Sequence, residues 1–582
     1  MHAQNASTTS TNQASFSANN SDLTQIINDT AGNSNGDIGG TVGNALSGGN
    51  TDASAQQSQR IHVAAAIGVN VTRHDALTSI SGSLQAKNLE ALTNNNGNFS
   101  TVGTGVAASL MQNSNSIGVG VAVSVNQNKA RVELGGQITA TGGNIVADAE
   151  LTQNMDGVYR GKYGALGISG SASGAGGKAG VAGSLAVVVA DGVSSVTVLN
   201  GAVLKAENGK INMEATDQSK LSAAAMAAVL SKGTTVGVGA AFALLYAQNK
   251  VLVIVGDDVK VTAKSFTVNA EKKPVSTEDW TLPFEASDLF TVDAETGEEG
   301  IINVATPNAE AGQNNFAVTL NIKASDLVNI AQLTSLMGSV NYYASAAAGT
   351  IVGGNDSKLA MAGAVSMLFS NSVTQASIGN GVTINLTDGD LNVNASSNNN
   401  ARIIGGAVSV SSAKAGVGLN VAVITNNDKV TASIGEDANI TVSQGSVIVN
   451  AESDLDAWSI TIAAAAKGGG GGSGATIGGG LTVIVSSNEV LAMIGDSSKI
   501  DASGNVTVQA GNDAYLLLVS ASAAGDTGSG IADGGTVAVI VTNNKAKALL
   551  GNYAEVKSGG KVTVAAANTE KLISILTSAS GA

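Results

Sequence analysis

The acidic stretch from residue 278 to residue 310 is the part of the chain whose residue types could bind a metal ion. Asp293, Glu295, Glu298 and Glu299 carry carboxylate oxygens, which are the hard ligands that Ca²⁺ prefers. Their spacing lacks the twelve-residue pattern of a dedicated calcium loop. We therefore expect a solvated acidic turn here and assign no metal ligand.

Side chains that could perform catalysis are sparse in the rest of the chain. The only histidines are His2, His62 and His74, there is no cysteine, and 13% of residues are charged. A carbohydrate-cleaving site needs carboxylates that converge in a cleft, whereas Asp454 and Asp456 have the pattern of surface turns. The sequence predicts no catalytic residue and no cofactor, so we expect the protein not to be an enzyme.

The composition indicates thin layers packed through small residues. Hydrophobic residues make up 43% of the 582 residues, but aromatic residues only 3%, and there are 73 glycines. The net charge of −15 argues against nucleic acid and against anionic membrane surfaces as partners. No apolar run approaches the roughly 20 residues of a membrane span. The first 30 residues lack the features of a signal peptide, which suggests a fragment of a longer protein.

A repeated strand pattern must position any binding residues. In "GVGVAVSVNQNKARVELGG", from Gly118 to Gly136, valine alternates with glycine, alanine and serine. Related stretches each end at an anchor glycine, and the last four anchors follow one another at nearly constant spacing. A fixed period of roughly 56 residues is typical of a solenoid. The anchors are Gly135, Gly201, Gly256, Gly379, Gly435, Gly495 and Gly551.

A second unit follows each anchor after a short interval, as Ile145 follows Gly135. It is a short alternating strand with an alanine two residues beyond, which predicts a position with no room for a larger side chain. The Ala/Gly-rich strips that close the repeat, such as residues 221–231, favour strand over helix because their neighbours have period-2 alternation. The alanines are Ala149, Ala215, Ala270, Ala395, Ala451, Ala510 and Ala566.

These patterns predict an all-β protein, a right-handed parallel β-helix or β-solenoid built from repeats of about 56 residues. We expect the valine face of each strand to fill a core and the small-residue face to let a second sheet approach closely. With two to three coils per repeat, the rod would be roughly 80–120 Å long. A string of small β domains is the competing interpretation.

Six asparagines recur seven or eight residues before an anchor glycine. Asparagine caps turns and can form hydrogen-bonded ladders between stacked coils. We interpret them as structural turn or ladder residues, with a row of ligand contacts as the alternative. They are Asn128, Asn249, Asn371, Asn427, Asn488 and Asn544.

One insertion interrupts the repeats and divides the chain into four parts. We expect residues 1–59 to be a low-complexity lead-in or irregular first coils, residues 60–271 and 339–582 to be solenoid repeats, and residues 272–338 to be the insertion. The insertion contains all three prolines, a hairpin pattern near Gly297 and a helix pattern ending at Gly338. We expect a small α/β subdomain there.

Insertions into solenoids often carry the binding face. Interface anchors are typically aromatic residues or arginine, and the insertion holds one of the two tryptophans. Trp280, Phe284 and Phe290 are therefore the predicted partner-binding residues.

The repeats resemble a known family. "GVGVAVSVNQNKARVELGG" and "VGLNVAVITNNDKVTASIG", followed by "GSVIVNAES", resemble the repeats of large filamentous adhesins of Gram-negative bacteria, in particular leukotoxin-like filamentous adhesins of type V secretion. The resemblance covers Arg60 to Ala582 apart from the insertion. It implies secretion, display on the cell surface and a stalk or adhesive role, and it carries over no catalytic residue.

We therefore expect a non-enzymatic, surface-exposed filamentous adhesin or structural rod segment, extracellular and anchored to the outer membrane in the full-length protein. The expected partner is a protein or glycan of a host or neighbouring cell, with no nucleic acid and no membrane insertion of this part. End-to-end or side-by-side self-association stays open. The alternatives are a segment of a secreted cytotoxin and, less favoured, a polysaccharide-active β-helix enzyme.

Overall fold

The computed structural model describes most of the chain outside the N-terminal lead-in and the insertion. Within these parts every regular element is a β-strand. No described residue belongs to a helix long and apolar enough to cross a membrane. The described residues are 2–4, 8–18, 60–109, 114–154, 164–173, 178–232, 235–273, 340–353, 357–412, 414–467, 474–526 and 530–581.

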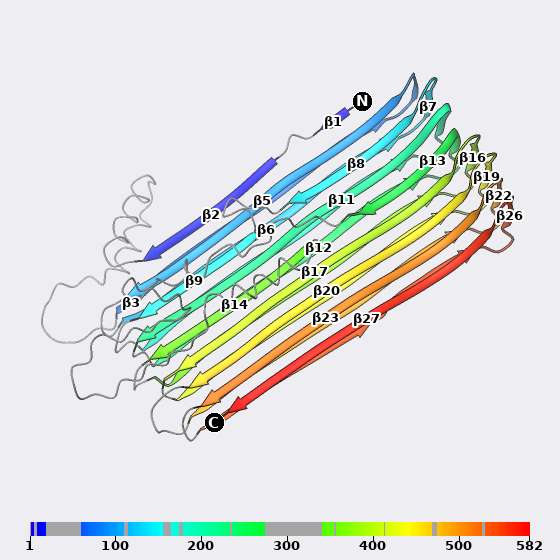
Figure 1. The fold of residues 1–582 in the computed structure, drawn as a ribbon. Helices are drawn as coiled ribbons and strands as arrows, with labels where there is room; N and C mark the ends of the chain where they lie inside the picture. The colour runs from blue at the N-terminus through cyan, green and yellow to red at the C-terminus, as the bar shows by residue number, and fades with distance from the viewer. Residues whose placement is uncertain are drawn as a thin grey trace, which may run out of the picture.

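Two parallel sheets lie face to face (Figure 1), and the described strands pair only in parallel. The nine-stranded sheet contains strands of about 20 residues, which exceeds the usual strand of five or six residues. Its members, in chain order, are β3 (Arg60–Ile80), β6 (Ser114–Leu134), β10 (Ala179–Val198), β12 (Val236–Val255), β15 (Leu359–Ile378), β18 (Ala415–Ile434), β21 (Ala475–Ile494), β24 (Ile531–Thr542) and β25 (Lys545–Leu550).

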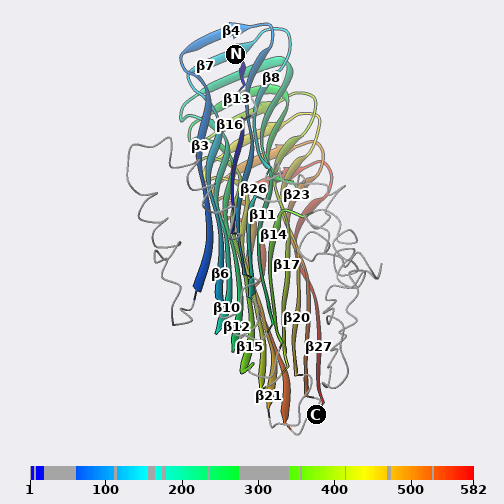
Figure 2. The same cartoon turned by 90° about the vertical axis from the view of Figure 1, so that its left-hand side faces the viewer.

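The eighteen-stranded sheet contains two sets of strands: strands of 3 to 30 residues that run along the length of the coils, and a set of four-residue strands. The first set is β1 (His2–Gln4), β2 (Thr8–Ala18), β5 (Leu89–Ser109), β8 (Ile145–Asn154), β9 (Ala165–Ser173), β11 (Val203–Lys232), β13 (Lys260–Lys272), β14 (Tyr342–Gly353), β17 (Leu391–Ser411), β20 (Val447–Lys467), β23 (Val506–Asp526) and β27 (Val562–Gly581). The short strands, which lie where the chain crosses between the sheets (Figure 2), are β4 (Ser83–Ala86), β7 (Gln137–Ala140), β16 (Thr383–Leu386), β19 (Asn439–Val442), β22 (Lys499–Ala502) and β26 (Glu555–Ser558).

Each repeat forms one coil, so the expectation of two to three coils per repeat is wrong. Val421 pairs with Leu481 of the next repeat, and Leu391 pairs with Val447. Eight coils spaced about 4.8 Å apart extend only about 38 Å along the axis, whereas a 20-residue strand is about 66 Å long. The long dimension therefore lies across the coils, and the expected rod of roughly 80–120 Å is also wrong.

The all-β architecture and the parallel solenoid are confirmed, and so is the strand assignment of the Ala/Gly-rich strip at 221–231, which lies in β11. The expected hairpin and helix of the insertion lie outside the described residues. So do the acidic turn, Trp280, Phe284 and Phe290.

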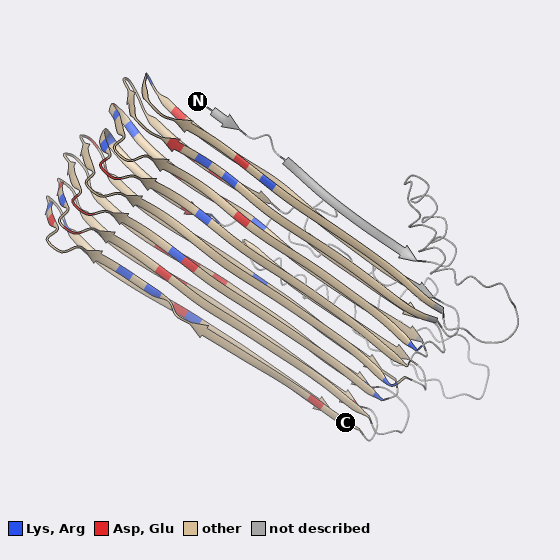
Figure 3. Ribbon diagram, turned by 180° about the vertical axis from the view of Figure 1, so that it is seen from behind, with Lys and Arg blue, Asp and Glu red and all other residues tan. Residues whose placement is uncertain are grey.

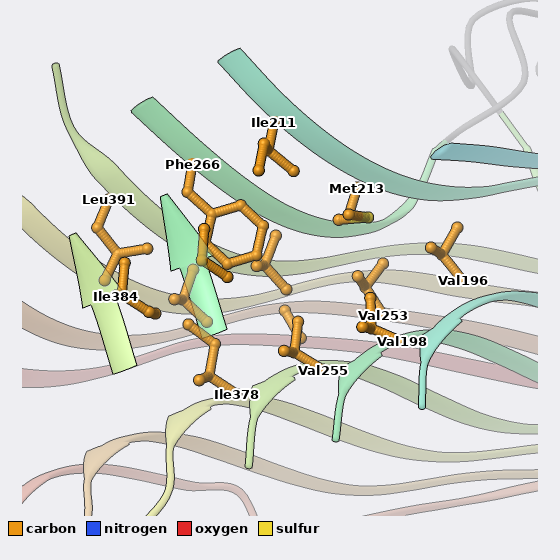
Figure 4. Close-up of a cluster of buried hydrophobic side chains, with 14 of the residues drawn as sticks. Val196, Val198, Ile211, Met213, Val253, Val255, Phe266, Ile378, Ile384 and Leu391 are labelled. Carbon is orange, nitrogen blue, oxygen red and sulfur yellow. The ribbon is translucent and has the colours of Figure 1, made fainter. Parts of the chain in front are cut away.

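The half of each coil next to the short strands is wide and filled by large aliphatic side chains. Val255, Ile378 and Leu391 point into this space from different strands around Phe266 (Figure 4), and all four are at most 1% exposed. The recurring alanines lie here in one column, since Ala395 pairs with both Ala270 and Ala451. We call this part the wide half.

The other half of each coil is thin, because only small side chains separate the sheets. A Cβ atom at Gly103 would overlap the carbonyl oxygen of Val121, and one at Gly120 would overlap that of Ile168. The buried cluster here is dominated by alanine. We call it the thin half.

The thin half reverses part of the expected strand packing. In β6 the small residues Gly118, Gly120 and Ala122 are buried, while Val121 and Val123 point outward and are half-buried. Close approach of the sheets is confirmed, but the valines do not fill a core. There is no space between the sheets for them, so they form the outer surface.

The anchor glycines allow the coils to stack at the turns. A Cβ atom at Gly435 would lie 2.6 Å from the carbonyl carbon of Gly379, and one at Gly495 would lie 2.5 Å from that of Gly435. Two residues after the anchor, the backbone takes a left-handed conformation, as at Gly381 (φ 64°) and Asp437 (φ 54°). The recurring glycine is therefore required by close backbone contact between coils.

Candidate functional site

The six predicted asparagines lie in or beside the long strands rather than at turns, and they divide between two faces. Asn371 and Asn427 stand one position earlier in the repeat than the others, and successive strand residues point to opposite faces. These two lie outside, where the Asn427 amide donates to Asn371 Oδ1 at 3.2 Å. Asn544, between β24 and β25, aligns with a buried asparagine of the preceding coil. The buried ones are Asn128, Asn249 and Asn488.

The inward asparagines belong to a row of polar side chains between the two halves of the coil, which we call the polar spine. The nine-stranded sheet contributes one side of it and the eighteen-stranded sheet contributes the other. Its members are Asn128, Asn249, Ser372, Asp428 and Asn488 on the first sheet, and Asp217, Lys272, Asn399, Ser453 and Asn512 on the second.

Lys272 is the central cation of the polar spine and is 1% exposed. Its Nζ donates to Ser372 Oγ at 2.7 Å and to Asn399 Oδ1. The same atom lies 4.7 Å from the ring centroid of Tyr342. A buried ammonium is stable only when such partners replace water, and through Ser372 and Asn399 Lys272 links its own coil to the next one.

Two buried carboxyls flank this cation. Asn249 Nδ2 donates to Asp217 Oδ2 at 2.6 Å, and Ser453 Oγ donates to Asp428 Oδ2 at 2.9 Å. Burial raises the pKa of both aspartates above the usual value, while Lys272 and the hydrogen bonds act in the opposite direction. Side chains that need one specific partner disfavour a slip of the strands along each other. The polar spine is therefore a structural feature that defines register.

The outward surface of the thin half is an apolar face. Three adjacent rows cross eight strands of the nine-stranded sheet, and every position except Thr425 is apolar. The rows are Ile67, Val121, Leu185, Phe242, Val365, Val421, Leu481 and Val537; Val69, Val123, Val187, Leu244, Met367, Val423, Val483 and Val539; and Val71, Val125, Val189, Tyr246, Phe369, Thr425, Val485 and Val541.

The outward surface of the eighteen-stranded sheet is different, and we call it the polar face. An amide ladder crosses it: Asn450 donates to Asn394 at 3.0 Å, Asn394 to Asn269 at 2.8 Å, and Asn269 to Glu214 at 3.3 Å. Acidic residues are concentrated on the same surface. They are Glu90, Asp148, Glu150, Glu214, Glu271, Glu452, Asp454, Asp456 and Asp513.

Among the acidic residues of the polar face, Asp148 has the most clearly shifted pKa. Burial raises its pKa from 3.8 to about 6, and the neighbouring carboxylates Glu214 and Glu150 act in the same direction. Among the described residues, no group of three or more His, Cys, Asp or Glu side chains could hold a metal ion. On the polar face, burial and the like charges of Glu214 and Glu150 therefore both oppose ionisation of Asp148.

An aromatic and cationic cluster lies on the eighteen-stranded sheet farther along the strands, and its central residue, Arg402, is 1% exposed. Arg402 forms an ion pair with Asp456 at 2.6 Å, and its guanidinium lies 4.6 Å from the ring centroid of Trp458. Trp458 also packs on Tyr515, with ring centroids 6.2 Å apart, and Lys571 lies over the Tyr515 ring at 5.2 Å. Arginine and aromatic residues are the side chains most enriched in interface hot spots.

Sequence reasoning missed this cluster and the amide ladder, although signals for both were present. Trp458 and Tyr515 are separated in the sequence by about one repeat period. Each ladder asparagine directly precedes one of the recurring alanines, as Asn394 precedes Ala395. Residues one period apart become neighbours when each repeat forms a single coil.

The insertion leaves the solenoid from within a strand. β13 ends at Lys272 and β14 begins at Tyr342, yet both pair with the uninterrupted strand β11, at Asp217 and Leu221. Only residues 218–220 separate these two partners on β11. On β11, three residues separate the partners of Lys272 and Tyr342, whereas the insertion separates Lys272 from Tyr342 in the chain itself.

The residues on either side of the insertion already continue the strand pairing. The Lys273 amide donates to the Asp217 carbonyl at 2.9 Å, and the Asn341 carbonyl accepts from β11 at 2.8 Å. With Val340, these residues supply the three positions that the gap requires. The predicted boundary includes Lys272, which the structure places in β13. Residues 274–339 are therefore the segment whose removal preserves register.

The chain matches no family model, and no curated protein and no solved structure is significantly similar to it.

Proposed function

We propose that this chain is a non-enzymatic segment of a secreted filamentous adhesin, extracellular and anchored to the bacterial outer membrane through other parts of the full-length protein. The observation that carries the proposal is the uninterrupted register of eight coils, from β3 to β24. Continuous parallel pairing with a filled interior gives a stiff support. The resemblance of the repeats to leukotoxin-like filamentous adhesins points the same way.

The proposed contact site is the insertion, predicted as residues 272–338, with Trp280, Phe284 and Phe290 as anchors. Its two ends lie next to each other in the middle of the eighteen-stranded sheet, at β13 and β14. A segment held at one point of a stiff support can contact a partner without disturbing the fold. The partner would be a protein or glycan of a host or neighbouring cell.

The test is to excise residues 274–339, so that Lys273 joins Val340. We expect unchanged β-sheet circular dichroism and a similar melting temperature, because three residues then bridge Lys272 and Tyr342 as they do on β11. We expect at least a tenfold loss of adhesion to cells that bind the intact chain. A matched control is the variant Trp458→Ala/Tyr515→Ala, which removes the only described tryptophan and its neighbour but keeps the insertion.

Two outcomes would contradict the proposal. If the excised protein adheres as tightly as the intact chain, the insertion is not the contact site. If the Trp458→Ala/Tyr515→Ala variant loses adhesion instead, the aromatic cluster of the eighteen-stranded sheet is the contact site. Release of a trapped dye from target cells by the intact chain would favour the cytotoxin alternative over adhesion.

A further inference from the structure

Buried charged side chains are rare among the described residues. Figure 3 shows long stretches of strand that carry no charged residue. Two of the buried charges, Lys272 and Asp428, lie beside the buried amide of Asn399 in the polar spine. An amine, an amide and a carboxyl in one dry site are the groups that an acid–base-catalysed amide exchange requires. The buried charged side chains are Asp217, Lys272, Arg402, Asp428, Lys467 and Asp526.

The lysine, the asparagine and the aspartate come from three successive coils. Lys272 in β13 pairs with Ser397 of β17, and Asn399, two residues beyond, points to the same inner side. On the facing sheet, Asp428 of β18 pairs with Ser372 of β15, which belongs to the same coil as Asn399. The asparagine therefore stands in the middle coil, with the lysine in the coil before it and the aspartate in the coil after it.

The lysine nitrogen is in contact with the asparagine side chain. Lys272 Nζ donates to Asn399 Oδ1, which is bonded to the carbonyl carbon Cγ. The hydroxyl of Ser372 holds the same nitrogen at 2.7 Å, and the ring of Tyr342 lies over it with its centroid 4.7 Å away. An amine fixed next to a carbonyl carbon has a very high effective concentration for attack on that carbon. The site therefore places a nucleophile and an electrophile in reach of each other.

Asp428 is the group that can move protons in this site. Its Oδ2 accepts from Ser453 Oγ at 2.9 Å, whereas its Oδ1 is buried and has no hydrogen-bond partner among the described residues. Burial raises the pKa of Asp428, while Lys272 and the nearby Asn399 side chain act in the opposite direction. A carboxyl that exchanges its proton easily can take one from an amine and give it to a leaving group.

We propose that Lys272 and Asn399 form an isopeptide bond, with Asp428 as the acid–base catalyst. Asp428 takes a proton from the Lys272 ammonium, and the free amine attacks Cγ of Asn399, so that the carbonyl electron pair moves to Oδ1. Asp428 then gives its proton to Nδ2, the Cγ–Nδ2 bond breaks as the electron pair returns from Oδ1, and ammonia leaves. Finally Asp428 takes the extra proton from Nζ. The products are one amide bond, one ammonia molecule and a protonated Asp428.

The bond fastens the strand from which the insertion leaves. Lys272 is the last residue of β13, and Asn399 lies 127 residues farther along the chain in β17. The bond therefore joins the coil that contains the insertion covalently to the next coil. A cross-link of this kind restricts the unfolded chain and so stabilises the fold. The ammonium described above as the central cation of the polar spine is the state from which the bond forms. The inference does not depend on the adhesin proposal.

Mass spectrometry of the denatured full chain tests the proposal. We expect a mass lower than that of the sequence by one ammonia molecule, and a branched proteolytic peptide that joins Lys272 to Asn399. The other buried lysine is an internal control. Lys467 faces the carboxylate of Asp526 at 3.1 Å, which is a poorer electrophile than an amide, so it should stay unlinked. An unchanged mass, or ammonia lost from an asparagine without a link to Lys272, would overturn the proposal.

Matched variants test the role of the aspartate. Asp428→Asn should give the full mass of its own sequence, whereas Asp217→Asn, at a buried carboxyl whose partners are Ser219 and Asn249, should still lose ammonia. Lys272→Arg keeps the positive charge but cannot form the bond, so it should also give the full mass, and circular dichroism checks that each variant is folded. If Asp428→Asn forms the link as completely as Asp217→Asn, the proposed catalysis is wrong. The mass of the unsubstituted chain tests the bond even where a variant does not fold.

Discussion

In strand β6, Gly118 and Gly120 face the interior ahead of the polar spine, whereas Val132 and Leu134 face it beyond the spine. The outward residues are reversed, with valines in the thin half and Lys129 in the wide half. One strand thus has opposite amphipathic character in its two halves without any change of register. The side-chain volume between the sheets therefore determines which outer surface is apolar.

The polar spine separates the thin half from the wide half. Substitution of its central residue, Lys272, should change the free energy of unfolding the most. We expect Lys272→Met to destabilise the fold by about 3–5 kcal/mol, because it leaves Asp217 and Asp428 buried without their cation. Urea unfolding measures the change. The control is Lys273→Met, whose ion pairs with Glu271 and Glu214 are partly exposed and should contribute less than about 1 kcal/mol.

The thin half should be intolerant of a single methyl group on its inner side. We expect Gly120→Ala to cost about 3 kcal/mol, at the upper end of overpacking effects, because its Cβ atom would overlap backbone of the facing sheet. The matched control is Gly183→Ala on β10, which points outward and would have no atom within 4 Å of its Cβ. Melting temperatures that fall equally for both variants would show that the inner side of the thin half is no more crowded than its outer side.

Much of the fold is predictable from the sequence, because alternation with period 2 and the long repeat are explicit in the residue order. The column containing Ala395 and Ala451 follows from the same spacing. The number of coils per repeat does not follow, since the repeat period is compatible with several short coils or one long coil. The exposed position of Val123 also does not follow, because alternation separates two faces but does not say which is inside.

The polar face should show a small pH effect that the apolar face lacks. The raised pKa of Asp148, about 6, means that the folded state holds its proton more tightly than the unfolded state. Ionised Asp148 therefore lowers the free energy of unfolding above pH 6. This destabilisation decreases as the pH falls toward 3.8 and is absent below that. We expect Asp148→Asn to raise the melting temperature at pH 7 by about 1 °C and to have no effect near pH 4.

The most direct test of the account is the reactivity of two adjacent single-cysteine variants in β6, Val123→Cys and Ser124→Cys. The chain contains no other cysteine, and both changes are small. Val123 lies on the apolar face, while Ser124 is 0% exposed between the sheets. We expect a maleimide to modify position 123 rapidly in the folded protein and position 124 only after unfolding. Protection at 123 with rapid modification at 124 would contradict the account, because the valines would then form the core.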